Sequence, residues 1–226
     1  CPGMNPTIFQ HDRMTSMTLL HSTFVVCGKA LKLTDVKIID SKEEFLKIVW
    51  DKRLRDGDEN RIRTITVDGT DFRFSPPNNG LTPARHWYSH KFKASAVRYE
   101  VGIGIQTGNI VWLSGPWPAG AYADLTIFRT GGLKEKLLEF GERAEADLGY
   151  RGEPETIELP LSGHVSTHAA KARSRLRHET CNRRFKQWAC LDQRFRHSFE
   201  LHGSCFTAVA VLTQLSIESG KSLFDA

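Results

Sequence analysis

The chain has 226 residues, enough for one sizeable domain with a small appendage, and with 40% hydrophobic and 25% charged residues it is neither disordered nor collagen-like in composition. The net charge is +5, but residues 171–197 contain nine Lys or Arg and two acids, so the remainder carries a net −2 and the basic character is local. No apolar stretch reaches the roughly 20 residues of a membrane helix, no signal-peptide pattern is present, and the five cysteines lack the CxxC spacing of a zinc ribbon.

Residues 1–60 are expected to form an N-terminal helical segment, and residues 61–226 the main domain. The string SKEEFLKIVWDKRLR, residues 41–55, opens with the capping-box pair Ser41 and Glu44 and continues with helically spaced apolar residues. This pattern predicts an amphipathic helix. Because the chain starts with Cys1 instead of Met, we expect a fragment or a trimmed chain.

Three consecutive strands are predicted next. RIRTITVDGTDFRF, residues 61–74, alternates and is rich in β-branched residues, and a polar loop over residues 75–93 follows it. SAVRYEVGIGIQ, residues 95–106, and IVWLSG, residues 110–115, flank the turn Thr-Gly-Asn. The last two runs should therefore pair as a hairpin.

The second half of the main domain alternates helix and strand. A helix is predicted within residues 116–140, a short strand within residues 142–152, a basic helix over residues 171–188 and a terminal helix over residues 196–218. Three strands, a helix, a strand and further helices indicate an α/β class. The order matches the ribonuclease H-like fold, a mixed sheet with an antiparallel meander flanked by helices.

Four acids occur where this topology places the ends of elements: Asp68, Asp124, Asp147 and Glu179. In a ribonuclease H-like sheet the first and fourth strands are neighbours, so Asp68 and Asp147 should approach each other. Clustered carboxylates repel and need cations to stay ionised together. Two Mg²⁺ or Mn²⁺ ions about 3.5 to 4 Å apart could activate water against a phosphodiester and stabilise the leaving oxygen.

Each acid also has a structural interpretation. Asp68 and Asp147 suit turns, Asp124 suits a helix N-cap, and Glu179 suits an ion pair with neighbouring arginines of the basic helix. Asp71 lies three positions after Asp68, so strand alternation sends it to the opposite face, where we expect it to be mostly exposed.

The strings VDGTDFRF, GPWPAGAYADLTIFR, EADLGYRG and RLRHETCNRRFKQW follow one another in this order. Together they resemble the blocks of the DDE superfamily endonucleases, the Harbinger-type and related insertion-sequence transposases. The similarity extends over about residues 60–224. Where many members of the family have a Phe-Gly pair after the glutamate, this chain has Asn182-Arg183, which indicates a divergent branch.

The resemblance implies that Asp68, Asp147 and Glu179 are the catalytic metal ligands, with Mg²⁺ or Mn²⁺ as the cofactor. Asp124 matches a family aspartate after a Pro-x-Gly turn, and its role stays open between a further metal ligand and a structural cap. The implied substrate is DNA, at transposon ends or derived sites. Residues 1–60 contain no convincing helix-turn-helix, so a separate DNA-binding partner protein and a homo-oligomeric active form are expected.

The basic helix could present a metal ligand and phosphate-binding cations on one face. At about 100° per residue, Glu179 shares a face with Arg175, Arg183 and Lys186. These three cations are candidate DNA ligands, and binding through them should depend strongly on salt.

The loop string HWYSHKFK, residues 86–93, combines aromatic and basic side chains. It could hold a DNA strand by stacking and phosphate contact, or it could be an ordinary loop whose aromatic residues anchor it to the core. Lys91 and Lys93 are candidate DNA ligands, and the resemblance assigns them to a recurring Lys-Phe-Lys feature of the family.

The sequence thus predicts a metal-dependent DNA endonuclease capable of transposase-type strand transfer. The alternatives are a transposase-derived DNA- or chromatin-binding protein that does not cut, and a general basic α/β protein. The expected location is nuclear in a eukaryote and cytoplasmic otherwise, in a reducing compartment and without a membrane association.

Overall fold

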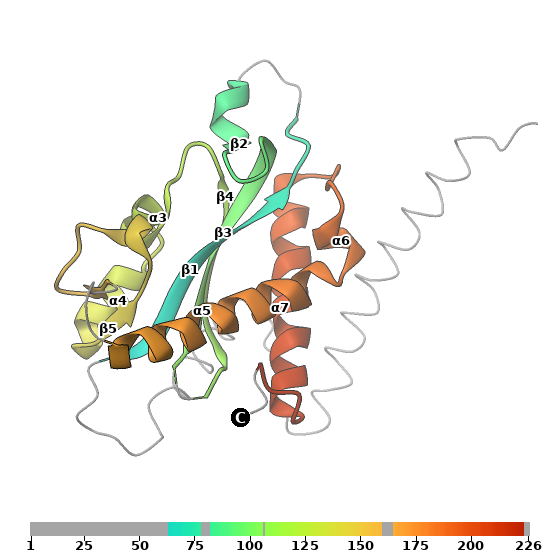
Figure 1. The fold of residues 1–226 in the computed structure, drawn as a ribbon. Helices are drawn as coiled ribbons and strands as arrows, with labels where there is room; N and C mark the ends of the chain where they lie inside the picture. Colours follow the sequence, from blue (N-terminus) through green and yellow to red (C-terminus); the bar gives the residue numbers. More distant parts are fainter. Residues whose placement is uncertain (1–62, 78–81, 106, 160–164, 224–226) are drawn as a thin grey trace, which may run out of the picture. The chain divides into compact units, whose positions relative to one another are not determined.

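The structure, a computed structural model, describes residues 63–77, 82–105, 107–159 and 165–223. All of them belong to one compact unit, residues 46–226. Their centre is a mixed six-stranded sheet in the order β2-β3-β1-β5-β6, with β4 paired to β3 (Figure 1). The strands are β1 (Arg63–Arg73), β2 (Tyr88–Ser89), β3 (Ala94–Gly104), β4 (Ile110–Pro118), β5 (Arg143–Glu145) and β6 (Ile157–Glu158).

The sheet combines an antiparallel and a parallel half. Strands β1, β3 and β4 form an antiparallel meander, whereas β5 runs parallel to β1 and β6 runs parallel to β5. The predicted hairpin, and the predicted contact between the first and fourth strands, are both confirmed. Together with the flanking helices, this arrangement is the α/β, ribonuclease H-like architecture that the element order predicts.

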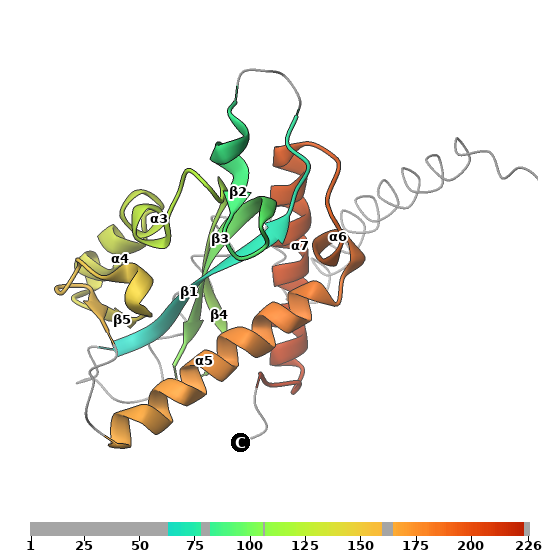
Figure 2. The ribbon, with the colours of Figure 1, turned by 45° about the horizontal axis from the view of Figure 1, so that its top comes forward.

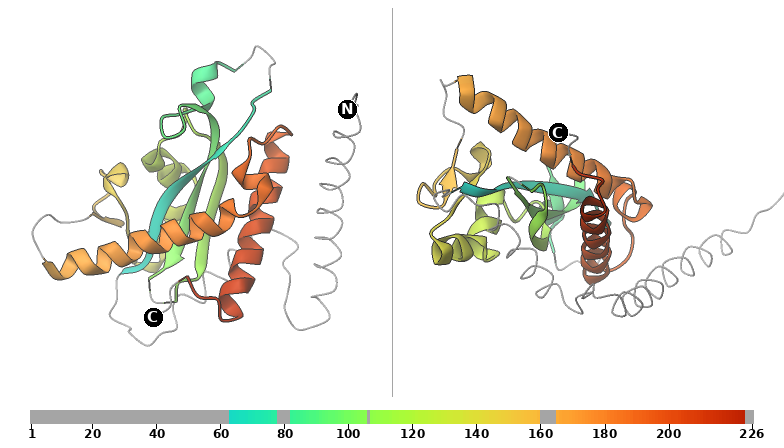
Figure 3. Two further views of the ribbon diagram at one scale, coloured as in Figure 1. Left: turned by 45° about the vertical axis from the view of Figure 1, so that its right-hand side comes forward. Right: turned by 90° about the horizontal axis from the view of Figure 1, so that it is seen from below.

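Helices cover both faces of the sheet (Figures 1 and 2). The short helices α3 (Asp124–Thr130) and α4 (Leu133–Phe140) lie on one face, and the long helix α5 (Val165–Lys186) crosses β1 on the other (Figure 3). Helix α7 (Phe199–Glu218) packs on the same face as α5, after the single turn α6 (Ala189–Asp192).

An aromatic cluster joins β1 and β3 to α7. The Phe72 ring lies 5.4 Å from Phe206, and Tyr99 stacks on Phe206 with a centroid separation of 3.7 Å. The Tyr99 hydroxyl and His202 Nδ1, both buried, are hydrogen-bonded at 2.6 Å. The apolar residues of β1 therefore determine which side of the strand faces α7. Because side chains alternate along a strand, this determines the direction of the remaining β1 side chains as well.

Several predicted boundaries change. The predicted helix of residues 116–140 is two helices, because the chain turns at Gly131 and Gly132 and the latter has φ 97°. The predicted strand of residues 142–152 is only the three residues of β5, followed by the 3-10 turn η2 (Leu148–Tyr150), and β6 was not predicted. The predicted helix of residues 41–55 lies outside the described residues.

The described part of the polar loop of residues 75–93 contains two short elements of secondary structure. The 3-10 turn η1 (Ala84–Trp87) leads directly into β2. Among the described residues, no helix is long and apolar enough to cross a membrane.

Candidate active site

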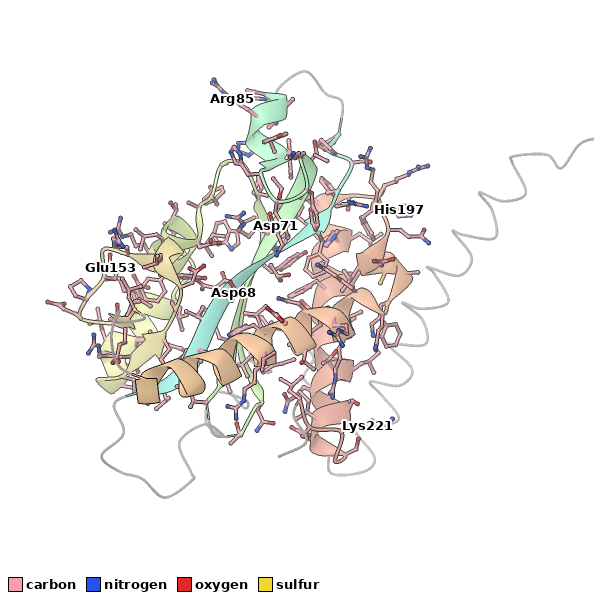
Figure 4. The ribbon with its side chains drawn as sticks, viewed as in Figure 1. Asp68, Asp71, Arg85, Glu153, His197 and Lys221 are labelled. Carbon is pink, nitrogen blue, oxygen red and sulfur yellow. The ribbon has the colours of Figure 1, made fainter. Side chains whose placement is uncertain are left out.

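Asp68 lies at the carboxyl end of the parallel β1–β5 pair. It follows by two positions Thr66, the last β1 residue that pairs with β5, and such strand ends are where α/β sheets form ligand crevices. Figure 4 shows Asp68 on β1 where α5 crosses the strand. Burial, together with the charges of Asp124 and Asp147, raises the pKa of Asp68 to about 6, although the Lys91 ammonium acts in the opposite direction.

Asp124 is the first residue of α3, and its carboxylate turns toward β1. A Cβ atom added to Gly69 would collide with the Asp124 carboxylate, and one added to Gly149 would lie 3.3 Å from Asp124 Oδ2. Two glycines therefore make room for this side chain beside Asp68 and Asp147. The N-cap of α3 is Ala123, so the interpretation of Asp124 as a helix N-cap is wrong.

Asp147 follows β5 by two residues and caps the turn η2. Its Oδ1 atom accepts a hydrogen bond of 2.8 Å from the backbone N–H of Gly149. The turn interpretation of Asp147 is therefore correct. The charge of Asp147 also contributes to the raised pKa values of Asp68 and Asp124. We refer to Asp68, Asp124 and Asp147 together as the acidic cluster. The structure thus brings together three of the four predicted acids, from β1, α3 and η2.

Glu179 is exposed on α5, and its neighbour His178 is buried. His178 Nε2 and the Thr66 hydroxyl are hydrogen-bonded at 2.8 Å, and farther along the helix the Lys186 ammonium lies 6.0 Å from the Phe72 ring centroid. Asp68 lies between Thr66 and Phe72 on β1, and Glu179 lies between His178 and Lys186 on α5. Within the described residues, no hydrogen bond or ion pair joins Glu179 to the aspartates.

Asp71 was predicted to be mostly exposed, and this prediction is wrong, because its exposed fraction is 3%. Arg98 stands opposite Asp71 in the β1–β3 register, and Arg98 Nε lies 2.7 Å from Asp71 Oδ1. The Ser89 hydroxyl donates a further hydrogen bond of 2.6 Å to Asp71 Oδ2. A buried carboxylate is retained here because an arginine and a hydroxyl satisfy it.

Arg98 also connects Asp71 to the acidic cluster. Its Nη1 atom lies 3.2 Å from Asp124 Oδ1. That buried oxygen accepts no well-aligned hydrogen bond from any described residue, so the contact is an ion pair of poor hydrogen-bond geometry. Burial raises the pKa of Asp124, and Arg98 opposes this shift.

Two buried residues that the sequence did not single out lie near Asp124. Glu100 pairs with Gly69 across the strands, and Trp112 Nε1 donates a 2.9 Å hydrogen bond to Glu100 Oε2. Burial raises the pKa of Glu100 to about 8 despite this hydrogen bond, so its carboxyl is mostly protonated at neutral pH. Burial also raises the pKa of Tyr150, and the charges of Glu100 and Asp124 add to the effect.

The predicted cations are distributed around the acids. Lys91 acts on the pKa values of both Asp68 and Asp124, and the Lys186 ammonium lies 5.5 Å from the Phe92 ring centroid. Lys93 and Arg183 are exposed, and the Arg175 side chain lies outside the described part of α5. Lys91 is therefore the predicted cation with a direct electrostatic effect on the cluster.

Of the two interpretations of the loop of residues 86–93, anchoring to the core is confirmed for Trp87, and contact with a DNA strand stays a prediction. The ring of Trp87 is buried, 5.2 Å from Phe74 and 5.3 Å from Phe199. The next ring, Tyr88, is 38% exposed. Trp87 thus anchors the loop to the core, whereas Tyr88 faces solvent.

The acidic cluster suits a hard divalent cation in its chemistry. Its donors are carboxylate oxygens, and one of them is buried without a well-aligned hydrogen bond. A cation would relieve the repulsion from Asp124 and Asp147 that adds to burial in raising the pKa of Asp68. Among the described residues, no group of three His, Cys, Asp or Glu side chains is already arranged as a metal site.

Comparison with protein families gives one match. A family model described as DDE superfamily endonuclease matches residues 67–214, which is more than half of the chain. The matched range starts at the residue before Asp68 and includes Asp124, Asp147 and Glu179. Searches of curated proteins and of solved structures return no match.

Proposed function

Because the chain belongs to the DDE superfamily endonucleases, we propose that it cleaves DNA in a divalent-metal-dependent, transposase-type reaction at the acidic cluster. The observation that carries this proposal is the convergence of three aspartates from separate parts of the chain where the pairing of β1 with β5 ends. Burial raises the pKa of Asp68 to about 6, and the charges of Asp124 and Asp147 add to this shift. Such an arrangement has an unfavourable electrostatic energy without a cation, as expected at a functional site.

Asp68, Asp124 and Asp147 would hold the metal, with Glu179 as the further ligand from α5. A bound pair of Mg²⁺ or Mn²⁺ ions supplies an activated water on one side of the scissile phosphate and stabilises the leaving oxygen on the other. The Asp124 carboxylate lies against Gly69, the neighbour of Asp68, and against Gly149, which also contacts Asp147; this supports a place for Asp124 among the ligands.

The position of Glu179 follows from the way α5 crosses the sheet. The hydrogen bond between His178 and Thr66 fixes the helix next to Asp68. Glu179 is the next residue along the helix and is exposed, so its side chain is not held by packing and would turn toward a bound cation. This supports Glu179 as the ligand that completes the site when metal and DNA are present.

Phosphates of the substrate would contact the cations around the cluster. The charge of Lys91 lowers the pKa values of Asp68 and Asp124. Arg183 and Lys186 lie in the last turn of α5. Arg175 and Lys93 are further proposed contacts. Neutralisation of phosphates by these groups implies binding that weakens steeply with salt.

After cleavage, the liberated 3′ hydroxyl could attack a second strand at the same acids, as strand transfer requires. We propose that this step uses a homo-oligomer and a separate DNA-binding partner protein. The protein would then act in the nucleus of a eukaryote or the cytoplasm of a bacterium.

A nicking assay tests the proposal. Supercoiled DNA carrying candidate terminal repeats is incubated with the full chain and Mg²⁺ or Mn²⁺, and with EDTA as the metal-free arm. We expect nicking with metal, none with EDTA, and a loss of at least about 1,000-fold for Asp147→Asn, because removal of a metal ligand removes the main stabilisation of the transition state.

The matched control is Glu139→Gln, a change at an exposed acid of α4. It should cut like the wild type. Nicking that survives Asp147→Asn would refute the assignment. Metal-dependent DNA binding without nicking by the wild type would instead support a transposase-derived binding protein that does not cut.

A further inference from the structure

A hollow of about 880 Å³ opens between η1, β2 and the loop that precedes α3. Its volume is within the range of about 300–1,000 Å³ typical of small-molecule sites. The chemically active side chains of its wall are Arg85, His86, Tyr88, His90 and Lys93. Figure 4 shows Arg85 at the η1 end of the molecule, far from Lys221 at the end of α7.

The walls of the hollow are fixed to each other. The backbone N–H of Gly120 donates a hydrogen bond of 3.0 Å to the carbonyl of His86. The two segments approach so closely that a Cβ atom at Gly120 would lie 2.8 Å from the backbone nitrogen of Tyr88. Tyr88 in turn pairs with Ser95 of β3. The hollow is therefore preformed, and a ligand would lose little free energy in ordering it.

The charged side chains that line the hollow favour an anionic ligand. Arg85 and Lys93 are both exposed on it, and none of the described residues that line the hollow is Asp or Glu. Arg and Lys side chains with free donors are the usual partners of phosphate oxygens.

The wall also carries exposed rings. Tyr88 is 38% exposed, and its ring meets that of His90 edge-on with a centroid separation of 5.3 Å. Its chain neighbour Trp87 is buried in the core, so the anchoring of this segment does not need Tyr88. An exposed ring beside phosphate-binding cations is the combination that stacks unpaired bases.

Two chain connections join the hollow to the acidic cluster. The wall residues Gly120 and Ala121 stand three or four positions before Asp124. On the other side, His90 is followed directly by Lys91, whose charge lowers the pKa values of Asp68 and Asp124. A DNA strand whose phosphate lies at the aspartates would therefore run past Lys91 into the hollow.

We propose that this hollow is a binding pocket for an unpaired nucleotide of the DNA strand next to the cleaved phosphodiester. The base stacks on Tyr88, and Arg85 and Lys93 hold the adjoining phosphate. A base inside a duplex remains stacked on its neighbours and cannot enter such a hollow, so the pocket distinguishes unpaired from paired DNA ends. This inference rests on the proposed function, because it takes DNA as the substrate.

The test measures equilibrium binding by fluorescence anisotropy in Ca²⁺ at low salt, with the full chain. The probes are one blunt duplex and two duplexes of the same sequence with a three-nucleotide 5′ or 3′ overhang. A 2-aminopurine in each overhang reports stacking through quenching of its fluorescence. The variants are Tyr88→Ala and Arg85→Ala, with Lys221→Ala as the charge-matched control at the opposite end of the molecule.

We expect at least one overhang duplex to bind roughly tenfold more tightly than the blunt duplex and to show quenching. Tyr88→Ala should abolish the quenching and the preference, Arg85→Ala should reduce the preference, and Lys221→Ala should change neither. Equal affinity for all three duplexes, or a preference that persists in both hollow variants, overturns the proposal. Thermal unfolding of the variants checks that they are folded.

The failure of this inference is separable from that of the proposed function. Nicking by the wild type with metal, together with equal binding of all three duplexes, refutes only the pocket. An overhang preference that depends on Tyr88, in a protein that never nicks, supports the pocket and contradicts the endonuclease.

Discussion

At the residue scale, the arrangement of charges around Asp124 explains how this carboxylate is held near Asp68 and Asp147. Arg98 lies between Asp71 and Asp124 and interacts with both. Asp68 and Asp147 have no comparable arginine among the described contacts, so no arginine opposes the rise in the pKa of Asp68 that burial and the charges of Asp124 and Asp147 cause. Arg98 is thus a structural partner that holds Asp124 in place and opposes the rise in the Asp124 pKa that burial causes.

Removal of Arg98 should therefore destabilise the fold. Arg98→Met leaves the carboxylate of Asp71, 3% exposed, without its ion-pair partner, and we expect a loss of about 3 kcal/mol in the free energy of unfolding. The matched control is Arg129→Met. Arg129 is half exposed and forms an ion pair with Glu153, so this substitution should lower the free energy of unfolding by no more than about 1 kcal/mol. Urea unfolding measures both, and equal costs for the two variants would contradict the role given to Arg98.

Glu100 gives the fold a pH dependence of predictable sign. Burial raises its pKa from 4.5 to about 8, so the folded protein binds this proton more tightly than the unfolded chain does. Its stabilising effect is complete below about pH 4.5 and is lost as the pH rises through about 8. Glu100→Gln keeps an acceptor for the Trp112 N–H but cannot ionise.

We expect the stability of Glu100→Gln relative to the wild type to rise between pH 5 and pH 8.5, by an amount on the order of 3 kcal/mol. Urea unfolding at both pH values gives this difference, in which the other titrating groups cancel. Glu139→Gln, at an exposed site, serves as the control and should show no such change. A constant difference between wild type and Glu100→Gln would contradict the buried, protonated state.

At the element scale, the strong periodic patterns of the sequence predict the meander and the long helices. β1, β3 and β4 alternate or carry β-branched residues, and both are typical of strands. The three residues of β5 are too few to show a period, and the boundary between α3 and α4 depends on the positive φ of Gly132. Short elements of this kind depend on tertiary pairing, so their bounds could not be predicted from local pattern.

The same limit explains the outcome for the site residues. Asp68, Asp124 and Asp147 could be proposed because their sequence blocks resemble those of the family. The predicted placement at element ends is correct for Asp124 and Asp147, but it is wrong for Asp68, which lies inside β1, and for Glu179, which lies inside α5. The burial of Asp71 could not be proposed, because its partner Arg98 is 27 positions away and only the β1–β3 register opposes them. Knowledge of that register would have been the one signal able to reveal the pair.

Helix α5 offers two adjacent arginines with different surroundings, which allows a controlled test of DNA contact. Arg184 donates hydrogen bonds to the carbonyls of Lys221 and Ser222, whereas Arg183 is exposed and was predicted to contact phosphate. Arg183→Ala should weaken DNA binding and reduce the slope of log K against log salt by about 1. Arg184→Ala should leave that slope unchanged.

Anisotropy titrations at several salt concentrations measure the slope, with circular dichroism as the check of helix content. A slope that falls in Arg184→Ala but not in Arg183→Ala would place the DNA on another face of α5.

At the scale of the whole molecule, the candidate site is assembled from elements far apart in the sequence. Asp68 lies in β1, Asp124 in α3 and Asp147 directly before η2, and Glu179 lies in α5. Figure 1 shows that α5 crosses β1. The family match covers α3, η2 and α5 and the part of β1 that contains Asp68. Residues that act as one catalytic unit give strongly non-additive effects when they are substituted together.

The most direct measurement is therefore the single-turnover nicking rate, with Mn²⁺, of Asp68→Asn, Glu179→Gln and the double variant. If the acids from β1 and α5 hold one metal site, each single substitution should reduce the rate by about 1,000-fold or more, and the double variant should be no slower than the singles. A Glu179→Gln protein that nicks at the wild-type rate, or two losses that simply multiply, would contradict the account.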